Sequence, residues 1–189
     1  PTPAPVSISR AVIANSAVVQ YAREKDAIAL PMTIIQHVPF EEPGLITTWA
    51  KDRHVPVDVV HVYAGEQLPD PVAVEFLVVL GGPMSANDPD AWIAQERDLI
   101  RAVVTTGKPM LGVCLGAQQL AKAFGQPITP VAHEVGWGPV QATALAQAMF
   151  GVQPELDVLH WHGEGFTLPH DAKRLFSSPA WENQGFIYH

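Results

Sequence analysis

The stretch Pro109-Met110-Leu111-Gly112-Val113-Cys114-Leu115-Gly116 joins a short apolar run to the start of an amphipathic segment. The apolar part, Pro109–Val113, predicts a buried strand. Leu115–Phe124 predicts a helix that Gly125 can end, because glycine readily adopts the left-handed conformation that closes a helix. A buried strand that passes directly into a helix is typical of proteins in which helices cover a central sheet.

The same alternation continues outward from this stretch. Phe76–Leu80 is a continuous apolar run that ends in Gly81-Gly82-Pro83, which is typical of a buried parallel strand. The other elements expected before Cys114 are the strands Thr33–His37 and Val57–Val62 and the helices Gly44–Arg53 and Ala91–Thr106. Beyond Gly125 the pattern is β-like, with expected strands at Gly138–Thr143, Val158–Trp161, Arg174–Ser177 and Gly185–Tyr188.

This order of elements predicts an α/β fold with an open, doubly wound, mostly parallel sheet that helices cover on both faces. The later strands predict an antiparallel β addition to it. We expect residues 32–189 to form one domain, because the clean alternation begins at Met32. Residues 1–31 open with Pro1-Thr2-Pro3-Ala4-Pro5 and are expected to be an N-terminal extension of unknown role.

The composition narrows the class of protein. Of 189 residues, 48% are hydrophobic and 16% are charged, so a sizeable core is expected rather than wholesale disorder. The net charge of −8 argues against a globally basic nucleic-acid-binding protein. No apolar run approaches the roughly 18 residues of a membrane span. Cys114 is the single cysteine, which excludes an intramolecular disulfide and fits a reducing compartment, so we expect a cytoplasmic protein.

The motif Gly112-x-Cys114-x-Gly116 matches the Gly-x-Ser-x-Gly nucleophile elbow with sulfur in place of oxygen. The glycines permit a tight strand-to-helix turn that exposes the middle side chain. The N-terminus of the following helix is expected to lower the pKa of the thiol and to offer the N–H of Leu115 to an oxyanion. The alternative is that Cys114 is a buried core residue, since cysteine is among the most buried residue types.

Two further features are expected near Cys114. The turn at Gly81-Gly82-Pro83 ends the preceding strand, so the backbone N–H of Gly82 could be a second oxyanion donor. Gln118 lies one helical turn after Cys114 and is expected to point towards the same pocket, the alternative being a solvated amide.

The segment His160-Trp161-His162-Gly163-Glu164 offers a possible base, because His162 and Glu164 have the spacing that places both on one side of an extended strand. A zinc site is not expected, since two histidines at this spacing have no obvious third ligand nearby. The remaining histidines are interpreted as surface or satisfied polar residues: His37, His54, His61, His133 and His170.

Taken together, these residues resemble the class I glutamine amidotransferases, above all the free-standing, GMP-synthase-like members. The matching stretches are Gln36–Glu41, Val79–Ser85, Gly112–Gln118, Glu134–Trp137 and His160–Glu164. The resemblance implies a flavodoxin-like fold and a Cys–His–Glu triad that releases ammonia from a glutamine amide through a γ-glutamyl thioester. We expect this activity to require neither a cofactor nor a metal.

Carried over by position, Cys114 resembles the nucleophile, and Gly82 and Leu115 resemble the oxyanion-hole donors. Gln118, with the turn at His162-Gly163, resembles the wall that holds the glutamine. The family's catalytic His and Glu follow the segment that resembles Asn183–Tyr188, whereas this sequence ends at His189. We therefore expect a C-terminally incomplete domain, and we do not assign His162 and Glu164 to the triad.

Three hypotheses follow for the function. The first is an amidotransferase or glutaminase that acts on glutamine or a γ-glutamyl small molecule, with a separate synthetase or acceptor subunit as its partner. The second is a non-catalytic binding or regulatory subunit with a degenerate triad. The third is a γ-glutamyl peptidase-like enzyme or another cysteine hydrolase on the same doubly wound fold. No nucleic acid and no membrane is expected among the partners.

Overall fold

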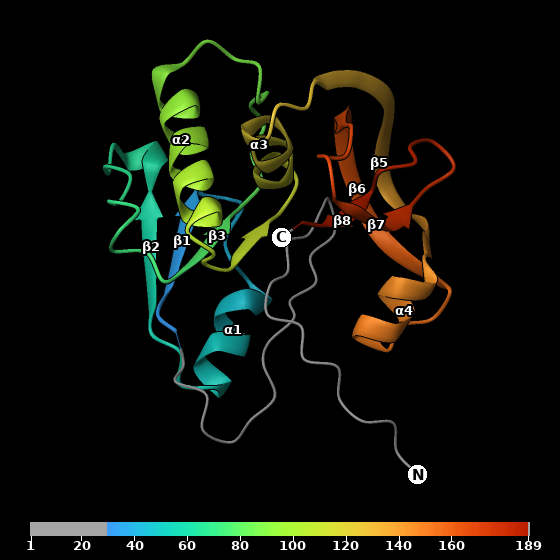
Figure 1. Ribbon diagram of the computed structural model, residues 1–189, viewed down its shortest axis with the longest axis horizontal. Coiled ribbons are helices and arrows are strands. Elements are labelled where there is room, and N and C mark those ends of the chain that lie inside the picture. Colours follow the sequence, from blue (N-terminus) through green and yellow to red (C-terminus); the bar gives the residue numbers. More distant parts are fainter. Residues whose placement is uncertain (1–29, 189) are drawn as a thin grey trace.

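The structure is a computed structural model that describes residues 30–188, so the expected extension at residues 1–31 lies almost wholly outside it. Its first sheet is parallel and four-stranded, with the order β2-β1-β3-β4 (Figure 1). The strands are β1 (Met32–Gln36), β2 (Val57–His61), β3 (Phe76–Val79) and β4 (Met110–Gly112). The helices between and after them are α1 (Leu45–Asp52), the 3-10 helix Val62–Ala64, α2 (Ala91–Thr105) and α3 (Leu115–Ala123).

Burial explains why these segments form a parallel sheet. Every residue of β3 and β4 is buried, as expected for strands that helices cover on both faces. Helix α2 buries Ile93, Leu99, Ile100 and Val103 at helical spacing, and α3 packs beside it. Figure 1 shows α2 and α3 side by side, with α1 well apart from them.

The strand order places the candidate site. The chain goes from β1 outward to β2 and then crosses to β3 on the other side of β1. In open α/β sheets, ligands bind where the winding direction reverses, beyond the carboxyl ends of the strands. The residues that follow β1, β3 and β4 at this edge are His37, the Gly81-Gly82 turn and Cys114.

The second sheet is antiparallel and four-stranded, with the order β6-β5-β7-β8. It comprises β5 (Ile128–Ala142), β6 (Glu155–Phe166), β7 (Lys173–Ser177) and β8 (Gly185–Ile187), and it lies beside α3 in Figure 1. The expected antiparallel addition is thus confirmed, and with it the α/β fold class. No helix within residues 30–188 is long and apolar enough to cross a membrane.

Two features of this second part differ from the sequence prediction. Helix α4 (Ala144–Phe150) was not predicted, although Thr143 caps it by accepting a hydrogen bond from the N–H of Ala146 and Gly151 ends it at φ 67°. Strand β5 begins at Ile128 rather than Gly138. Its first half contains Pro130 and an irregularity in register before Glu134, so pairing with β6 rather than local propensity keeps it extended.

Candidate active site

Cys114 occupies a strained turn between β4 and α3. Its φ is 51° and its ψ −109°, which side-chain-bearing residues rarely adopt. Gly112 and Gly116, which flank Cys114, must be glycines because neighbouring backbone atoms lie too close to leave room for a side chain. A Cβ on Gly116 would lie 2.2 Å from the carbonyl oxygen of Val79, and one on Gly112 would lie 2.7 Å from the backbone of Gly116. The geometry is therefore that of a nucleophile elbow, a feature that tends to occur where chemistry needs an exposed, fixed side chain.

Backbone groups surround the sulfur. The backbone N–H groups of Leu115 and Gly82 both lie towards Sγ of Cys114, where each lowers the pKa of the thiol. The thiol in turn faces the carbonyl oxygen of Trp161 on β6, 3.9 Å from Sγ. Two N–H groups that converge on one point are what an oxyanion hole requires. The structure therefore brings Gly82, Leu115 and Cys114 together as the sequence predicted.

The pKa of Cys114 differs from the expectation. The pKa of the thiol is raised to about 11, mainly by burial and to a smaller extent by the carboxylates of Glu41 and Glu164. The N–H groups of Leu115 and Gly82 act in the opposite direction but do not outweigh burial. The N–H of Leu115 thus lowers this pKa as predicted, but the expected net lowering is wrong because burial outweighs it.

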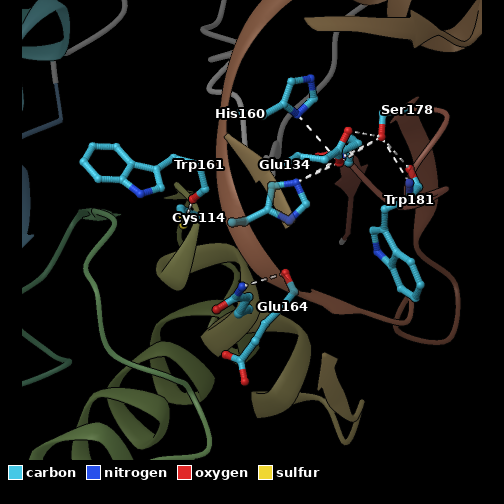
Figure 2. Close-up of polar contacts among 10 residues, drawn as sticks. Cys114, Glu134, His160, Trp161, Glu164, Ser178 and Trp181 are labelled. Carbon is cyan, nitrogen blue, oxygen red and sulfur yellow. Dashed lines mark hydrogen bonds and ion pairs between the residues drawn. The ribbon is translucent and has the colours of Figure 1, made fainter. Parts of the chain in front are cut away.

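A pocket of about 1070 Å³ opens beside Cys114 between the two sheets. One wall comes from the segments after β1 and β3, including Glu41 and Met84, and the other from β5 and β6, including Val135 and Trp161. Figure 2 shows Trp161 projecting from β6 on the side of the strand away from His160 and Glu134. The pocket is large enough for an amino-acid amide and has both polar and apolar walls.

Gln118 lines this pocket and is almost fully buried. Its Nε2 donates to the backbone carbonyl oxygen of Glu164, 3.2 Å away, which ties α3 to β6 (Figure 2). The Glu164 carboxylate accepts a hydrogen bond from Oγ of Ser85 at 2.9 Å. Gln118 thus faces the pocket rather than solvent.

His162 does not pair with Glu164. Its Nε2 lies 3.0 Å from Oε2 of Glu134 on β5 and 3.2 Å from Nε2 of Gln184. Burial lowers the pKa of His162, although the charge of Glu134 opposes this effect. Among residues 30–188, neither His162 nor Glu164 hydrogen-bonds to the sulfur of Cys114, so the pair suggested by spacing is not assembled as a base.

Gly163 also lines the pocket, but it lies within strand β6 and not in the turn that the sequence suggested. A Cβ at this position would lie 2.7 Å from the ring of His133, so only glycine fits here without displacing that ring. The His162-Gly163 segment is thus held on one side by His133 and on the other by the hydrogen bonds of His162.

Glu134, His160 and His162 form a buried group of possible metal ligands, which supplies the third ligand that the sequence did not reveal (Figure 2). Glu134 and His162 are register partners on β5 and β6. However, Nε2 of Gln184 lies 2.6 Å from Oε2 of Glu134, and Ser178 donates to the same carboxylate at 2.9 Å. These donors already engage the Glu134 carboxylate, so we interpret the group as a hydrogen-bond network that braces the His162-Gly163 segment of β6.

His37 and Glu96 were missed as site residues. Nδ1 of His37 lies 2.8 Å from the carbonyl oxygen of Gly81, and Nε2 lies 2.6 Å from Oε2 of Glu96. The interpretation of His37 as a satisfied polar residue holds, but it lies directly behind the Gly81-Gly82 turn. A signal was present in the sequence, because Glu96 is spaced at helical intervals from the apolar residues Ile93 and Ile100 on the buried face of α2.

The chain belongs to the class I glutamine amidotransferase family, whose model matches residues 45–188. That range contains the elbow, the Gly81-Gly82 turn and the pocket wall on β6. It therefore covers every residue that the sequence singled out for the site.

Individual relatives agree with this assignment. The glutamine amidotransferase-like protein YfeJ of Salmonella typhimurium is 36% identical over 172 residues, which is 82% of this chain and 71% of YfeJ. The crystal structure of a glutamine amidotransferase from Thermotoga maritima matches with a TM-score of 0.79 and 31% identity, covering 85% of this chain and 72% of that one. The glutamine-hydrolysing GMP synthase of Thermomicrobium roseum is 29% identical over 64% of this chain, and the match spans only 22% of that synthase.

Proposed function

We propose that this domain hydrolyses the side-chain amide of glutamine, or of another γ-glutamyl compound, through a thioester on Cys114. The observation that carries the proposal is the strained turn at Cys114, whose sulfur faces the N–H groups of Gly82 and Leu115. Strain at a non-glycine residue beside converging donors is typical of a nucleophile, and a core cysteine would need neither.

In this reaction the sulfur attacks the amide carbon, and the carbonyl oxygen becomes an oxyanion that Gly82 and Leu115 stabilise. The C–N bond then breaks, and the proton of the thiol leaves with the nitrogen as ammonia or an amine. Water next attacks the thioester and releases the γ-carboxylate with the free thiol. Because burial holds the pKa of Cys114 at about 11, the proton must be removed after the substrate binds.

We assign substrate binding to Gln118 and to the His162-Gly163 segment of β6, which both line the pocket beside Cys114. In this assignment the amide of Gln118 contacts the substrate, while the His162 ring holds the segment through Glu134. His162 is not proposed as the general base, because Glu134 and Gln184 already engage its Nε2.

We further propose that residues 32–189 act as a domain that passes ammonia to a separate synthetase or acceptor subunit. The similarity to part of a GMP synthase supports such a partner. A cytoplasmic location would suit a catalytic thiol, since reducing conditions keep it active.

The pocket wall favours an alternative substrate, a γ-glutamyl compound with an apolar leaving group. Its exposed apolar residues are Val135, Leu159 and Trp161.

The test is ammonia release from glutamine by the full chain, compared with its Cys114→Ala and Cys114→Ser variants. We expect both variants to lose ammonia release while they still bind glutamine in calorimetry, because the pocket remains. Ammonia release that survives Cys114→Ala would overturn the proposal. If the unaltered chain binds glutamine without releasing ammonia, the same assay on a version extended by the family's catalytic His and Glu decides: release supports the proposal, and no release supports the non-catalytic binding subunit.

A further inference from the structure

A buried imidazole–carboxylate pair lies directly behind the Gly81-Gly82 turn. His37 follows β1 and Glu96 is on α2, and both side chains are completely buried. The ring makes two short contacts, 2.8 Å from Nδ1 to the Gly81 carbonyl oxygen and 2.6 Å from Nε2 to Glu96. The Cβ of His37 lies 3.1 Å from the position that a Cβ on Gly82 would take, so His37 and Gly82 are in contact.

These contacts indicate the protonation state of the ring. A neutral imidazole has one N–H donor and one acceptor nitrogen, but here both ring nitrogens face acceptors. The Gly81 carbonyl oxygen cannot donate. Oε1 of Glu96 accepts from Nε2 of Gln119 at 3.1 Å, which leaves Oε2 to the ring. The arrangement fits an imidazolium whose two N–H groups donate to the Gly81 oxygen and to Glu96.

The charges around His37 agree with this state. Burial opposes the positive charge, but the hydrogen bond and the charge of Glu96 outweigh it, so the pKa of His37 is raised. Glu41 also faces the ring and raises its pKa further. The guanidinium of Arg97 is linked to Glu96 through Gln119. Its Nε donates to Oε1 of Gln119 at 3.2 Å, and Nε2 of Gln119 donates to Glu96.

The contact to Gly81 matters because the Gly81 carbonyl and the Gly82 N–H belong to the same peptide unit. A cation that hydrogen-bonds to the carbonyl oxygen withdraws electron density from the amide and makes its N–H a stronger donor. That N–H is one of the two that face the sulfur of Cys114. A continuous chain of contacts therefore runs from Glu96 through His37 and one peptide bond to the reacting sulfur.

We propose that His37 is a positioning residue that acts through the Gly81–Gly82 peptide, with its imidazolium fixing and polarising the N–H that stabilises the oxyanion. Glu96 keeps the ring oriented and charged. The inference rests on the proposed function, because the oxyanion forms only when Cys114 is acylated. Its protonation part can be tested without any activity.

The first test is nuclear magnetic resonance of the full chain with ¹⁵N-labelled histidine rings, the His37 signals being assigned by their loss in His37→Asn. We expect both ring nitrogens of His37 to keep their protons above pH 6.5, the ordinary value for histidine. We expect Glu96→Gln to lower the pH at which the ring loses its second proton. A ring of the unaltered chain that is already neutral at pH 6.5 would overturn the inference.

The second test compares two reactions of Cys114. Acylation by γ-glutamyl p-nitroanilide passes through an oxyanion, whereas alkylation by iodoacetamide does not. His37→Asn keeps an amide donor near the position of Nδ1 but carries no charge. We expect it to slow acylation several-fold, by no more than the roughly 100-fold cost of losing a whole oxyanion donor. Alkylation should slow less than acylation, because the Gly82 N–H affects it only through the pKa of the thiol.

The controls separate the possible failures. His61→Asn, at a half-exposed histidine, should alter neither reaction. The double variant His37→Asn/Glu96→Gln avoids a buried unpaired carboxylate and should show the same selective loss. Equal slowing of both reactions, or of neither, would contradict the proposal. If the unaltered chain releases no nitroaniline, the proposed function fails, and the ring protonation still decides whether His37 is an imidazolium.

Discussion

At the scale of single residues, the backbone geometry at Cys114 favours a role as nucleophile, whereas the pKa of its thiol does not. Burial and two carboxylates keep the sulfur protonated, so the free site is protected from unselective reaction. In the proposed reaction, the thiol reacts once a substrate brings its carbonyl against Gly82 and Leu115. The selectivity of the thiol therefore follows from its surroundings rather than from a low intrinsic pKa.

This account predicts the pH dependence of alkylation. The rate of iodoacetamide reaction at Cys114 should rise through pH 9.0, the ordinary value, and level off only near pH 11. Glu41→Gln should speed the reaction at pH 8, since it removes a negative charge that raises the pKa. Glu42→Gln, at the neighbouring exposed residue, is the matched control and should have no effect. A rate that levels off at or below pH 9.0 would show that burial does not raise this pKa.

At the scale of elements, the site depends on how closely α3 approaches the parallel sheet. The carbonyl oxygen of Val79 accepts the N–H of Val113, and Gly116 lies against the same carbonyl. The turn at Cys114 is thus strained because β3, β4 and the first turn of α3 meet at one place.

We predict that Gly116→Ala destabilises the fold by at least about 1–3 kcal/mol, the usual cost of forcing an extra methyl group into a packed interior. A Cβ there would lie 2.2 Å from the Val79 oxygen. Gly125→Ala is the control, because its φ is 84° but nothing lies within 4 Å, so it carries only the cost of the left-handed backbone, about 1–2 kcal/mol. Urea unfolding measures both. A smaller loss for Gly116→Ala than for Gly125→Ala would contradict the close approach.

The elbow could be predicted from sequence because its chemistry lies within five neighbouring residues, Gly112–Gly116. The His37–Glu96 and Glu134–His162 pairs could not, because they join elements that only the fold brings together. Helix α4 could have been predicted from Thr143 and Gly151, yet the β-like residues around it hid the signal. The spacing of His162 and Glu164 was misleading, because the closer carboxylate comes from β5.

At the scale of the whole molecule, the candidate site is where two different sheets meet. The parallel sheet supplies the proposed nucleophile and oxyanion donors, and the antiparallel sheet supplies the opposite wall of the pocket. The alternating pattern predicted both sheets, since each strand carries its own local signal. The length of β5 was not predictable, because half of it is held by β6 rather than by its own residues.

Two buried histidines should give the free energy of unfolding a maximum near pH 6.5. The pKa of His162 is lowered in the fold, so stability rises with pH up to its unfolded value of 6.5. The pKa of His37 is raised, so its contribution is complete below 6.5 and is lost as pH rises through the folded value. Urea unfolding of His37→Asn should lack the decline above pH 6.5, while His61→Asn should keep it. Parallel curves for His37→Asn and the unaltered chain between pH 6 and 9 would contradict this.

The central claim is that Cys114 is a nucleophile for γ-glutamyl compounds. The most direct measurement is the intact mass of the chain after incubation with a glutamine-analogue electrophile, followed by peptide mapping. The account predicts one adduct, located on Cys114, formed more slowly when glutamine is present and absent from Cys114→Ala. Labelling that glutamine does not slow, or no labelling at all, would contradict the claim.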